Sequence, residues 1–97
     1  MVKLSCRVMD TDNGGIVWGD PISVEIEPAT EGTSDEMALE NARRINKATW
    51  LATGGLEDEE APGEVVRAAG TEYAGICWID DLGHQGATQI IVEWHSA

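Results

Sequence analysis

Hydrophobic and polar residues alternate in two stretches near the start of the chain. Residues 2–9 and 22–27 place an apolar side chain at every second position, which is typical of a strand with one face in a core and the other in water. Asn13-Gly14 between the two stretches is a strong signal for a hairpin turn. Apolar residues resume at 16–18 and are then interrupted by Gly19-Asp20-Pro21, which is either a bulge or a second turn. Because proline cannot donate a ladder hydrogen bond, the interruption predicts a sheet edge.

Residues 34–53 change to a helical period and form the only long helix that the sequence predicts. Thr33 with Glu36 three residues later matches a capping box, Ser34 is a competing cap, and Gly54-Gly55 supplies a stop. At about 100° per residue, an Ala-rich stripe falls on one face, which suits close packing against a sheet. The stripe consists of Met37, Ala38, Ala42, Ile45, Ala48, Thr49 and Ala52.

Three further strand segments follow the helix, at residues 65–69, 73–80 and 87–95. The continuous apolar run 76–79 is typical of a central strand, and the last strand is apolar on both faces. Trp78 and Trp94 lie in these strands and are expected in the core. The order is therefore β-β-α-β-β-β. The sequence predicts a single α+β domain over residues 1–97, with one helix (about 34–53) packed on a mostly antiparallel sheet of four to five strands. One strand pair across the helix is left open to parallel pairing.

Eighteen acids and six bases give the chain a net charge of −12. This charge disfavours direct binding to DNA, RNA or an anionic membrane and favours a basic protein partner; alternatively, the acidity serves only solubility. Half of the cations, Arg43, Arg44 and Lys47, share the predicted helix. Acids spaced like phosphates can mimic nucleic acid in a basic groove; alternatively, the helix cations and the loop acids pair with each other. The densest negative charge lies at Glu57, Asp58, Glu59 and Glu60 and on the face of Glu25 and Glu27.

Four tryptophans occur in a chain that has no phenylalanine. On a helical wheel Trp50 lies off the predicted core face, beside Leu39 and Arg43. An exposed Leu39–Arg43–Trp50 stripe is typical of a binding hot spot, where tryptophan and arginine are enriched, and Trp18 is the other candidate anchor. In the alternative interpretation, Trp50 folds over the sheet edge or packs on the segment 56–64.

Asp80, Asp81 and His84 lie close together in the sequence, and Glu93 and His95 follow on the next predicted strand. Carboxylates and histidines can hold a divalent metal or transfer protons. Aspartate and glycine are also ordinary turn residues, and the turn interpretation is preferred. We therefore expect no catalytic group, no metal and no cofactor.

Cys6 and Cys77 lie in separate apolar runs without a CxxC pair or a histidine-rich tract, which predicts buried free thiols in a reducing cytosol. Because burial raises the pKa of a thiol, Cys77 is not expected to act as a nucleophile. The short, polar N-terminus does not match a signal peptide. No apolar run approaches the roughly 20 residues of a membrane span.

In size and charge, the chain resembles the small acidic inhibitors encoded by phages and mobile elements, which include anti-CRISPR proteins and DNA mimics. The resemblance implies a non-catalytic, cytoplasmic protein-binding module that blocks a basic, nucleic-acid-binding surface. The acids would supply attraction, and Trp50 or Trp18 the apolar anchor. One alternative is an immunity protein or antitoxin against a cationic toxin. Another is a small metal-dependent enzyme or assembly subunit that uses the Asp80/Asp81/His84 loop.

Overall fold

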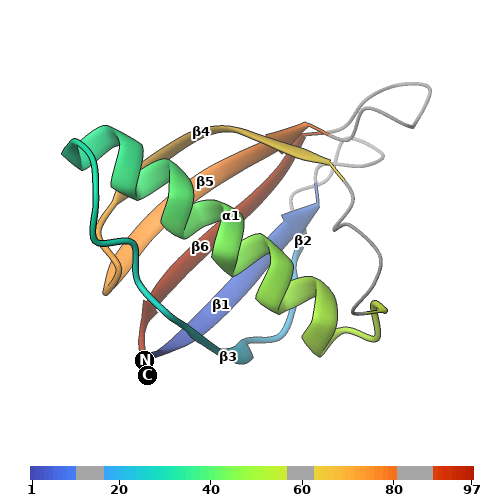
Figure 1. The fold of residues 1–97 in the computed structure, drawn as a ribbon. Helices are drawn as coiled ribbons and strands as arrows, with labels where there is room; N and C mark the ends of the chain where they lie inside the picture. The colour runs from blue at the N-terminus through green and yellow to red at the C-terminus, as the bar shows by residue number, and fades with distance from the viewer. Residues whose placement is uncertain (11–16, 57–62, 81–88) are drawn as a thin grey trace.

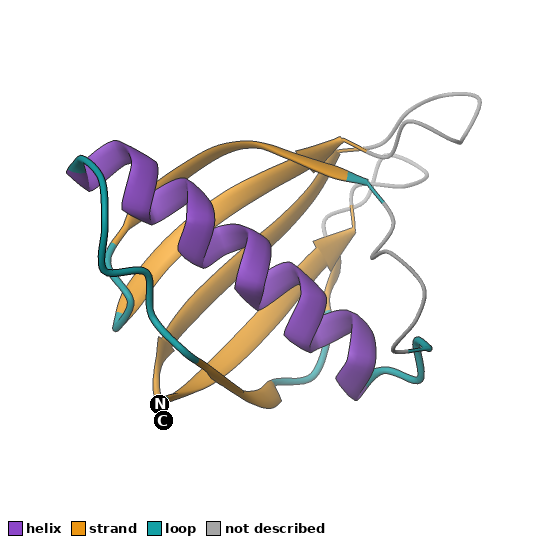
Figure 2. Ribbon diagram, viewed as in Figure 1, coloured by secondary structure: helices purple, strands orange, loops and turns teal. Residues whose placement is uncertain are grey.

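One helix crosses one face of a six-stranded sheet (Figure 1, Figure 2). The structure is a computed structural model that describes residues 1–10, 17–56, 63–80 and 89–97. The predicted α+β class is confirmed, with the elements in the predicted order. In chain order they are β1 (Val2–Asp10), β2 (Val17–Trp18), β3 (Ile22–Ile26), α1 (Ser34–Ala52), β4 (Glu64–Gly70), β5 (Ala74–Asp80) and β6 (Gln89–Ser96).

Every strand pairing in the described part of the chain is antiparallel. The strand order is β2-β1-β6-β5-β4, and β3 also pairs with β1. Both β2 and β3 pair with the edge of β1 that faces away from β6. In the short segment that joins β2 to β3, the Gly19 N–H donates a hydrogen bond to the Val8 carbonyl oxygen of β1 (2.9 Å). Residues 19–21 are therefore a break within one edge strand and not a second turn, so the sheet has five strand positions.

The pairing of β1 with β6 brings the two ends of the chain together (Figure 1). Leu4 lies opposite Ser96 in the register, and the Ala97 N–H donates to the Lys3 carbonyl oxygen (3.1 Å). The last strand of the chain therefore occupies the centre of the sheet, between β1 and β5. A central strand has neighbours on both sides, which agrees with the apolar residues on both faces of β6.

The helix begins where the capping pattern predicts. Thr33 has extended backbone angles, and its Oγ1 accepts a hydrogen bond from the Glu36 N–H (3.2 Å). Thr33 and not Ser34 is therefore the cap. At the other end, Gly54 has a φ of +102°, a left-handed conformation that favours glycine and stops the helix.

The buried stripe of α1 matches the prediction at four positions, Ala38, Ala42, Ile45 and Thr49. Ala52 is exposed because it lies at the end of the helix. Asn41 joins the stripe although it is polar, and its Oδ1 accepts a hydrogen bond from the Ala29 N–H (2.8 Å). This bond ties the segment before the helix to the helix and gives the buried oxygen a partner.

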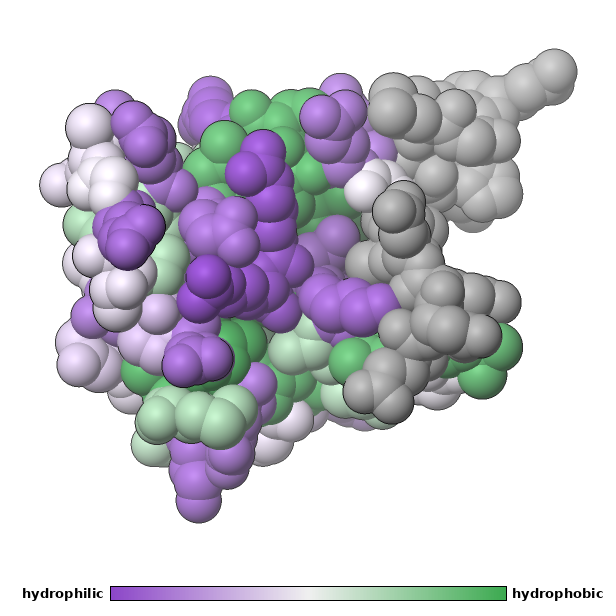
Figure 3. All heavy atoms as spheres, viewed as in Figure 1, coloured by the Kyte–Doolittle hydropathy of each residue, from purple (hydrophilic) through white to green (hydrophobic). Residues whose placement is uncertain are grey.

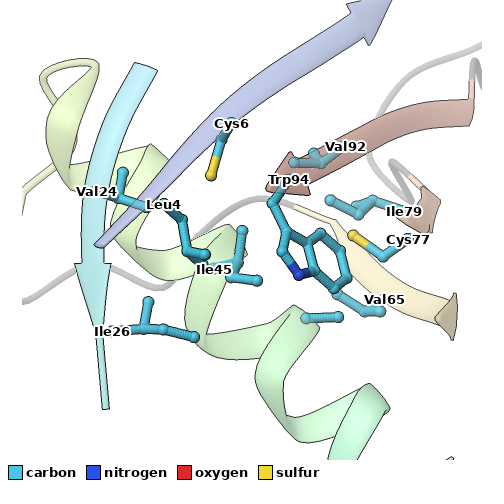
Figure 4. Close-up of a cluster of buried hydrophobic side chains, with 11 residues drawn as sticks. Leu4, Cys6, Val24, Ile26, Ile45, Val65, Cys77, Ile79, Val92 and Trp94 are labelled. Carbon is cyan, nitrogen blue, oxygen red and sulfur yellow. The ribbon is translucent and has the colours of Figure 1, made fainter. Parts of the chain in front are cut away.

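The core lies between α1 and the sheet, with Trp94 in the middle of the cluster (Figure 4). Trp94 is 2% exposed, and its indole N–H donates to the Thr71 carbonyl oxygen (2.9 Å). Its ring lies over Gly75, the residue directly opposite on β5. A Cβ atom on Gly75 would overlap the Trp94 ring, so the missing side chain makes room for the indole. The cluster consists of Leu4, Cys6, Val24, Ile26, Ala42, Ile45, Val65, Cys77, Ile79, Val92 and Trp94.

We predict that Gly75→Ala lowers the free energy of unfolding by about 1–3 kcal/mol, because the added methyl group overpacks the core against Trp94 and the Ala69 carbonyl. Gly19→Ala is the matched control, since a Cβ atom there would meet only the Val8 carbonyl oxygen, at 3.5 Å. Urea unfolding followed by circular dichroism measures both. Equal transition midpoints for the two variants would contradict the packing described here.

Candidate functional site

The two predicted acids on the first sheet edge are exposed at β3. Glu25 lies in β3, where its Oε1 is 3.9 Å from the Lys3 Nζ across the strand pair. Glu27 follows the end of the strand, and its carbonyl oxygen accepts a hydrogen bond from Arg44 Nη1 (2.7 Å). The acids Glu57, Asp58, Glu59 and Glu60 lie outside the described residues.

Two of the helix cations bind an acid of their own helix. Glu40 forms an ion pair with Arg43, whose Nη1 lies 3.7 Å from its Oε2. Its Oε1 also accepts a hydrogen bond from the Arg44 Nε (3.1 Å). Exposed pairs of this kind stabilise a helix by only about 0.3–0.5 kcal/mol each. On this side of the molecule polar residues follow the helix, and hydrophobic residues show between α1 and β4 (Figure 3). The arginines therefore help to order α1 and the end of β3.

The predicted exposed stripe Leu39–Arg43–Trp50 does not form. Leu39 is half-buried and packs against the core, and Trp50 is also half-buried. Arg43 alone is exposed, with 54% of its side chain accessible. The physical reason is that this side of the helix leans toward the sheet, so Leu39 and Trp50 cover the edge of the core. Trp50 is therefore less exposed than the predicted stripe requires, and its role as an apolar anchor stays a prediction. The side chain of Trp18, in β2, lies outside the described part.

Trp50 lines a hollow between the C-terminal half of α1 and the sheet. The hollow has a volume of about 280 Å³, and strand residues Ile22, Ile79 and Ile90 line its apolar side. The Trp50 ring lies against Gly55, where a Cβ atom would overlap it. Its indole N–H is buried without a hydrogen-bond partner. Gly55 precedes the segment 56–64 that the alternative interpretation named, and residues 57–62 lie outside the described part, so packing on that segment stays a prediction.

The sheet register places Asp80 and His95, two members of the predicted cluster of acids and histidines, at opposite ends of β5. Asp80 pairs with Gln89, whereas His95 pairs with Ala74 at the other end of β5. Six residues of extended strand separate the two positions by roughly 20 Å. Asp81 and His84 lie outside the described residues, and within the described ones no group of histidine, cysteine and acidic side chains is placed to hold a metal ion. The idea of one site that includes both Asp80 and His95 is therefore wrong.

Both cysteines are free and fully buried, as predicted. Burial raises the pKa of Cys6 to about 11 and that of Cys77 to about 12. A thiol with such a pKa is protonated at neutral pH and is a poor nucleophile. Neither cysteine is suited to covalent catalysis.

The face of the sheet opposite to α1, which we call the open face, holds the residues that the sequence analysis missed. Trp78 lies on this face and is half-buried there, so its predicted place in the core is wrong, whereas Trp94 is confirmed as a core residue. Met9, Ile91 and Trp78 lie directly opposite one another across β1, β6 and β5. Arg67 of β4 continues this row, with its Cζ 3.9 Å from the centroid of the Trp78 ring.

A signal for the open face was present in the sequence. The continuous runs 76–79 and 90–92 are apolar on both faces of their strands, and a sheet with two apolar faces needs two covering layers. The described part of the chain has one helix, which covers one face. With two apolar sheet faces and one predicted helix to cover them, the sequence could have predicted that one face keeps a row of apolar residues with no helix over it.

Comparisons with known proteins return no match: no family model, no curated protein and no solved structure is similar to this chain. Among the described residues, no helix has the length and apolar character that a membrane crossing requires.

We predict that Trp50→Phe changes the free energy of unfolding by less than about 1 kcal/mol. The smaller ring loses buried area, but the substitution also removes an unpartnered buried N–H, which costs about 1–3 kcal/mol. Trp94→Phe is the matched control, because it removes an indole N–H that has a partner and leaves the Thr71 carbonyl without one. Thermal unfolding should show the Trp94 variant as clearly the less stable of the two; the reverse order would contradict this account.

We predict that the protein loses stability as the pH rises above about 9. Both thiols have a raised pKa in the folded chain, so between about pH 9 and pH 11 the unfolded chain releases protons that the folded chain keeps, and unfolding becomes easier. The loss should reach about 4 kcal/mol by pH 10.5, because each of the two thiols contributes about 1.4 kcal/mol per pH unit above pH 9. The measurement compares unfolding from pH 8 to pH 11 in the wild type and in a Cys6→Ala, Cys77→Ala variant. Identical slopes would show that the thiols are not the cause.

Proposed function

We propose that this protein is a non-catalytic binding module that inhibits a basic, nucleic-acid-binding protein by covering its cationic surface. The observation that supports this most is the excess of acids with no cation to pair with. The chain has eighteen acids and six bases, and in the described part only Glu25 and Glu40 take part in ion pairs. The other carboxylates of the described residues have no ion-pair partner there and can meet the charges of a partner.

Several acids without an ion-pair partner among the described residues lie near the start of α1. Asp35 and Glu36 lie exposed in the first turn of the helix. Glu72 lies in the turn between β4 and β5, and this turn shares a small hollow with Ser34 and Met37. None of the three acids has an ion-pair partner among the described residues. Elsewhere in the sequence, Glu57, Asp58, Glu59 and Glu60 add four consecutive acids that a basic protein can contact.

Inhibition of this kind needs no chemistry from the inhibitor. Carboxylates spread over a compact surface attract the Lys and Arg side chains that otherwise contact phosphates. Once bound, the domain occupies the nucleic-acid groove and excludes the natural ligand. The buried, protonated thiols and the divided Asp80 and His95 positions agree with a protein that acts by binding.

The experiment begins by capturing partners on the immobilised chain at low salt and identifying them by mass spectrometry. The purified partner is then titrated with the chain in competition with a labelled nucleic acid. We expect displacement of the nucleic acid, and an affinity that falls at least tenfold between 50 and 500 mM NaCl, because the contacts are ionic. Capture of a cationic toxin instead would favour the immunity-protein alternative.

A pair of charge-neutralised variants tests which acids are used. The first changes Glu57, Glu59 and Glu60 to Gln and Asp58 to Asn, and it should weaken binding by at least tenfold. The matched variant neutralises Asp35, Glu36 and Glu72 at the other acidic region. Equal losses would indicate an effect of net charge alone. Binding that survives 1 M NaCl and both variants would overturn the proposal.

A further inference from the structure

We propose that the open face of the sheet is the interface with a second copy of this chain, so that the protein is a symmetric dimer held sheet to sheet. The proposal goes beyond the inhibitor function and does not depend on it. It rests on the apolar row of the open face, on the charge of that face, and on its size.

The row runs straight across the sheet, near the end where β1 and β5 finish and β6 begins. Met9, Ile91 and Trp78 lie side by side on adjacent strands, and Arg67 follows on the edge strand. Met9 is only 8% exposed, so the accessible apolar surface of the row comes from the half-buried Ile91 and Trp78. Ile76 lies on the same face, two residues before Trp78 on β5. None of the described elements packs on this face, since α1 covers the other one (Figure 1). A contiguous apolar strip between polar positions is typical of an interaction surface.

Trp78 and Arg67 are the residue types that dominate binding energy at interfaces. The Arg67 guanidinium lies 3.9 Å from the centre of the indole ring and follows a bulge in β4, between Val65 and Arg67. Beside it Val66 is 48% exposed. The bulge therefore turns both Val66 and Arg67 outward, next to the tryptophan.

The charge of the open face selects a second copy over a basic partner. By strand register this face carries three cations and four acids, whereas the whole chain has a net charge of −12. Arg7 lies opposite Glu93, and Lys3 forms an ion pair with Glu25. A strongly acidic chain can approach another copy of itself only where its own surface is nearly neutral. The charged residues concerned are Lys3, Arg7, Arg67, Glu25, Glu64, Asp80 and Glu93.

The size of the face fits a small dimer. Five strand positions about 4.8 Å apart, with strands of seven residues or more, give a face of roughly 24 by 23 Å. A standard interface takes about 800 Å² of accessible surface from each partner. The flat area of the face, roughly 550 Å², is below that value, so a dimer would use the whole face and would be a weak one. Two sheets pack in this way about 10 Å apart.

Sedimentation equilibrium of the full chain from about 1 to 500 µM tests the proposal. We expect a concentration-dependent dimer of twice the 10.4 kDa chain mass. Dimerisation should strengthen from 50 to 500 mM NaCl, because salt screens the repulsion between two acidic chains. This salt dependence is opposite in sign to that of the inhibitor function, so the two proposals fail separately.

Trp78→Thr and Ile91→Thr should each weaken the dimer by at least about tenfold, since both remove an apolar contact from the row while threonine still suits a strand. Tyr73→Thr is the matched control. Tyr73 is a 58% exposed aromatic residue in the turn before β5, and its change should leave the dimer intact. Circular dichroism confirms that each variant is folded. A monomer at every concentration, or a dimer that both row variants leave unchanged, would overturn the proposal.

Discussion

The fold depends on the contact between one tryptophan and one glycine. Trp94 lies on the central strand and fills the space between the sheet and α1, with its ring over Gly75. Its N–H binds the Thr71 carbonyl, so the indole also fixes the turn between β4 and β5. In a chain without phenylalanine, this ring is the one aromatic side chain of the buried cluster among the described residues. The small residues of the helix, such as Ala42, complete the packing because they let α1 lie close to the sheet.

A single helix leaves the sheet with one covered and one open face, and this constraint shapes the rest of the surface. The covered face holds the two protonated thiols and excludes them from chemistry. The open face keeps an apolar row, with Trp78 beneath Arg67. Because β5 and β6 are apolar on both sides, their outward residues must either face water or meet another surface. The proposed dimer is the second case, in which the outward residues meet the same face of another copy.

The helix and the open face of the sheet also determine where the cations lie. Three cations lie on the outer side of α1 and three on the open face, so the acids elsewhere have few partners. Glu40 binds two arginines, and Lys3 binds Glu25, which leaves acids such as Asp35 and Glu72 to the solvent. An apolar, nearly neutral face and separate acidic regions can serve different partners, because their attraction responds to salt in opposite ways.

The sequence by itself determined the elements, because capping, turns and periodicity act between near neighbours: the Thr33 cap, the strand segments and the edge at Pro21 all follow from local patterns. The tertiary structure decided which faces are covered. A helical wheel cannot show that Trp50 leans on the sheet, since that depends on where the sheet edge lies. Alternation cannot tell that Trp78 faces outward in a run that is apolar at every position. Only the antiparallel register, which pairs residues distant in the chain, places Asp80 and His95 at opposite ends of the sheet and aligns the row of the open face.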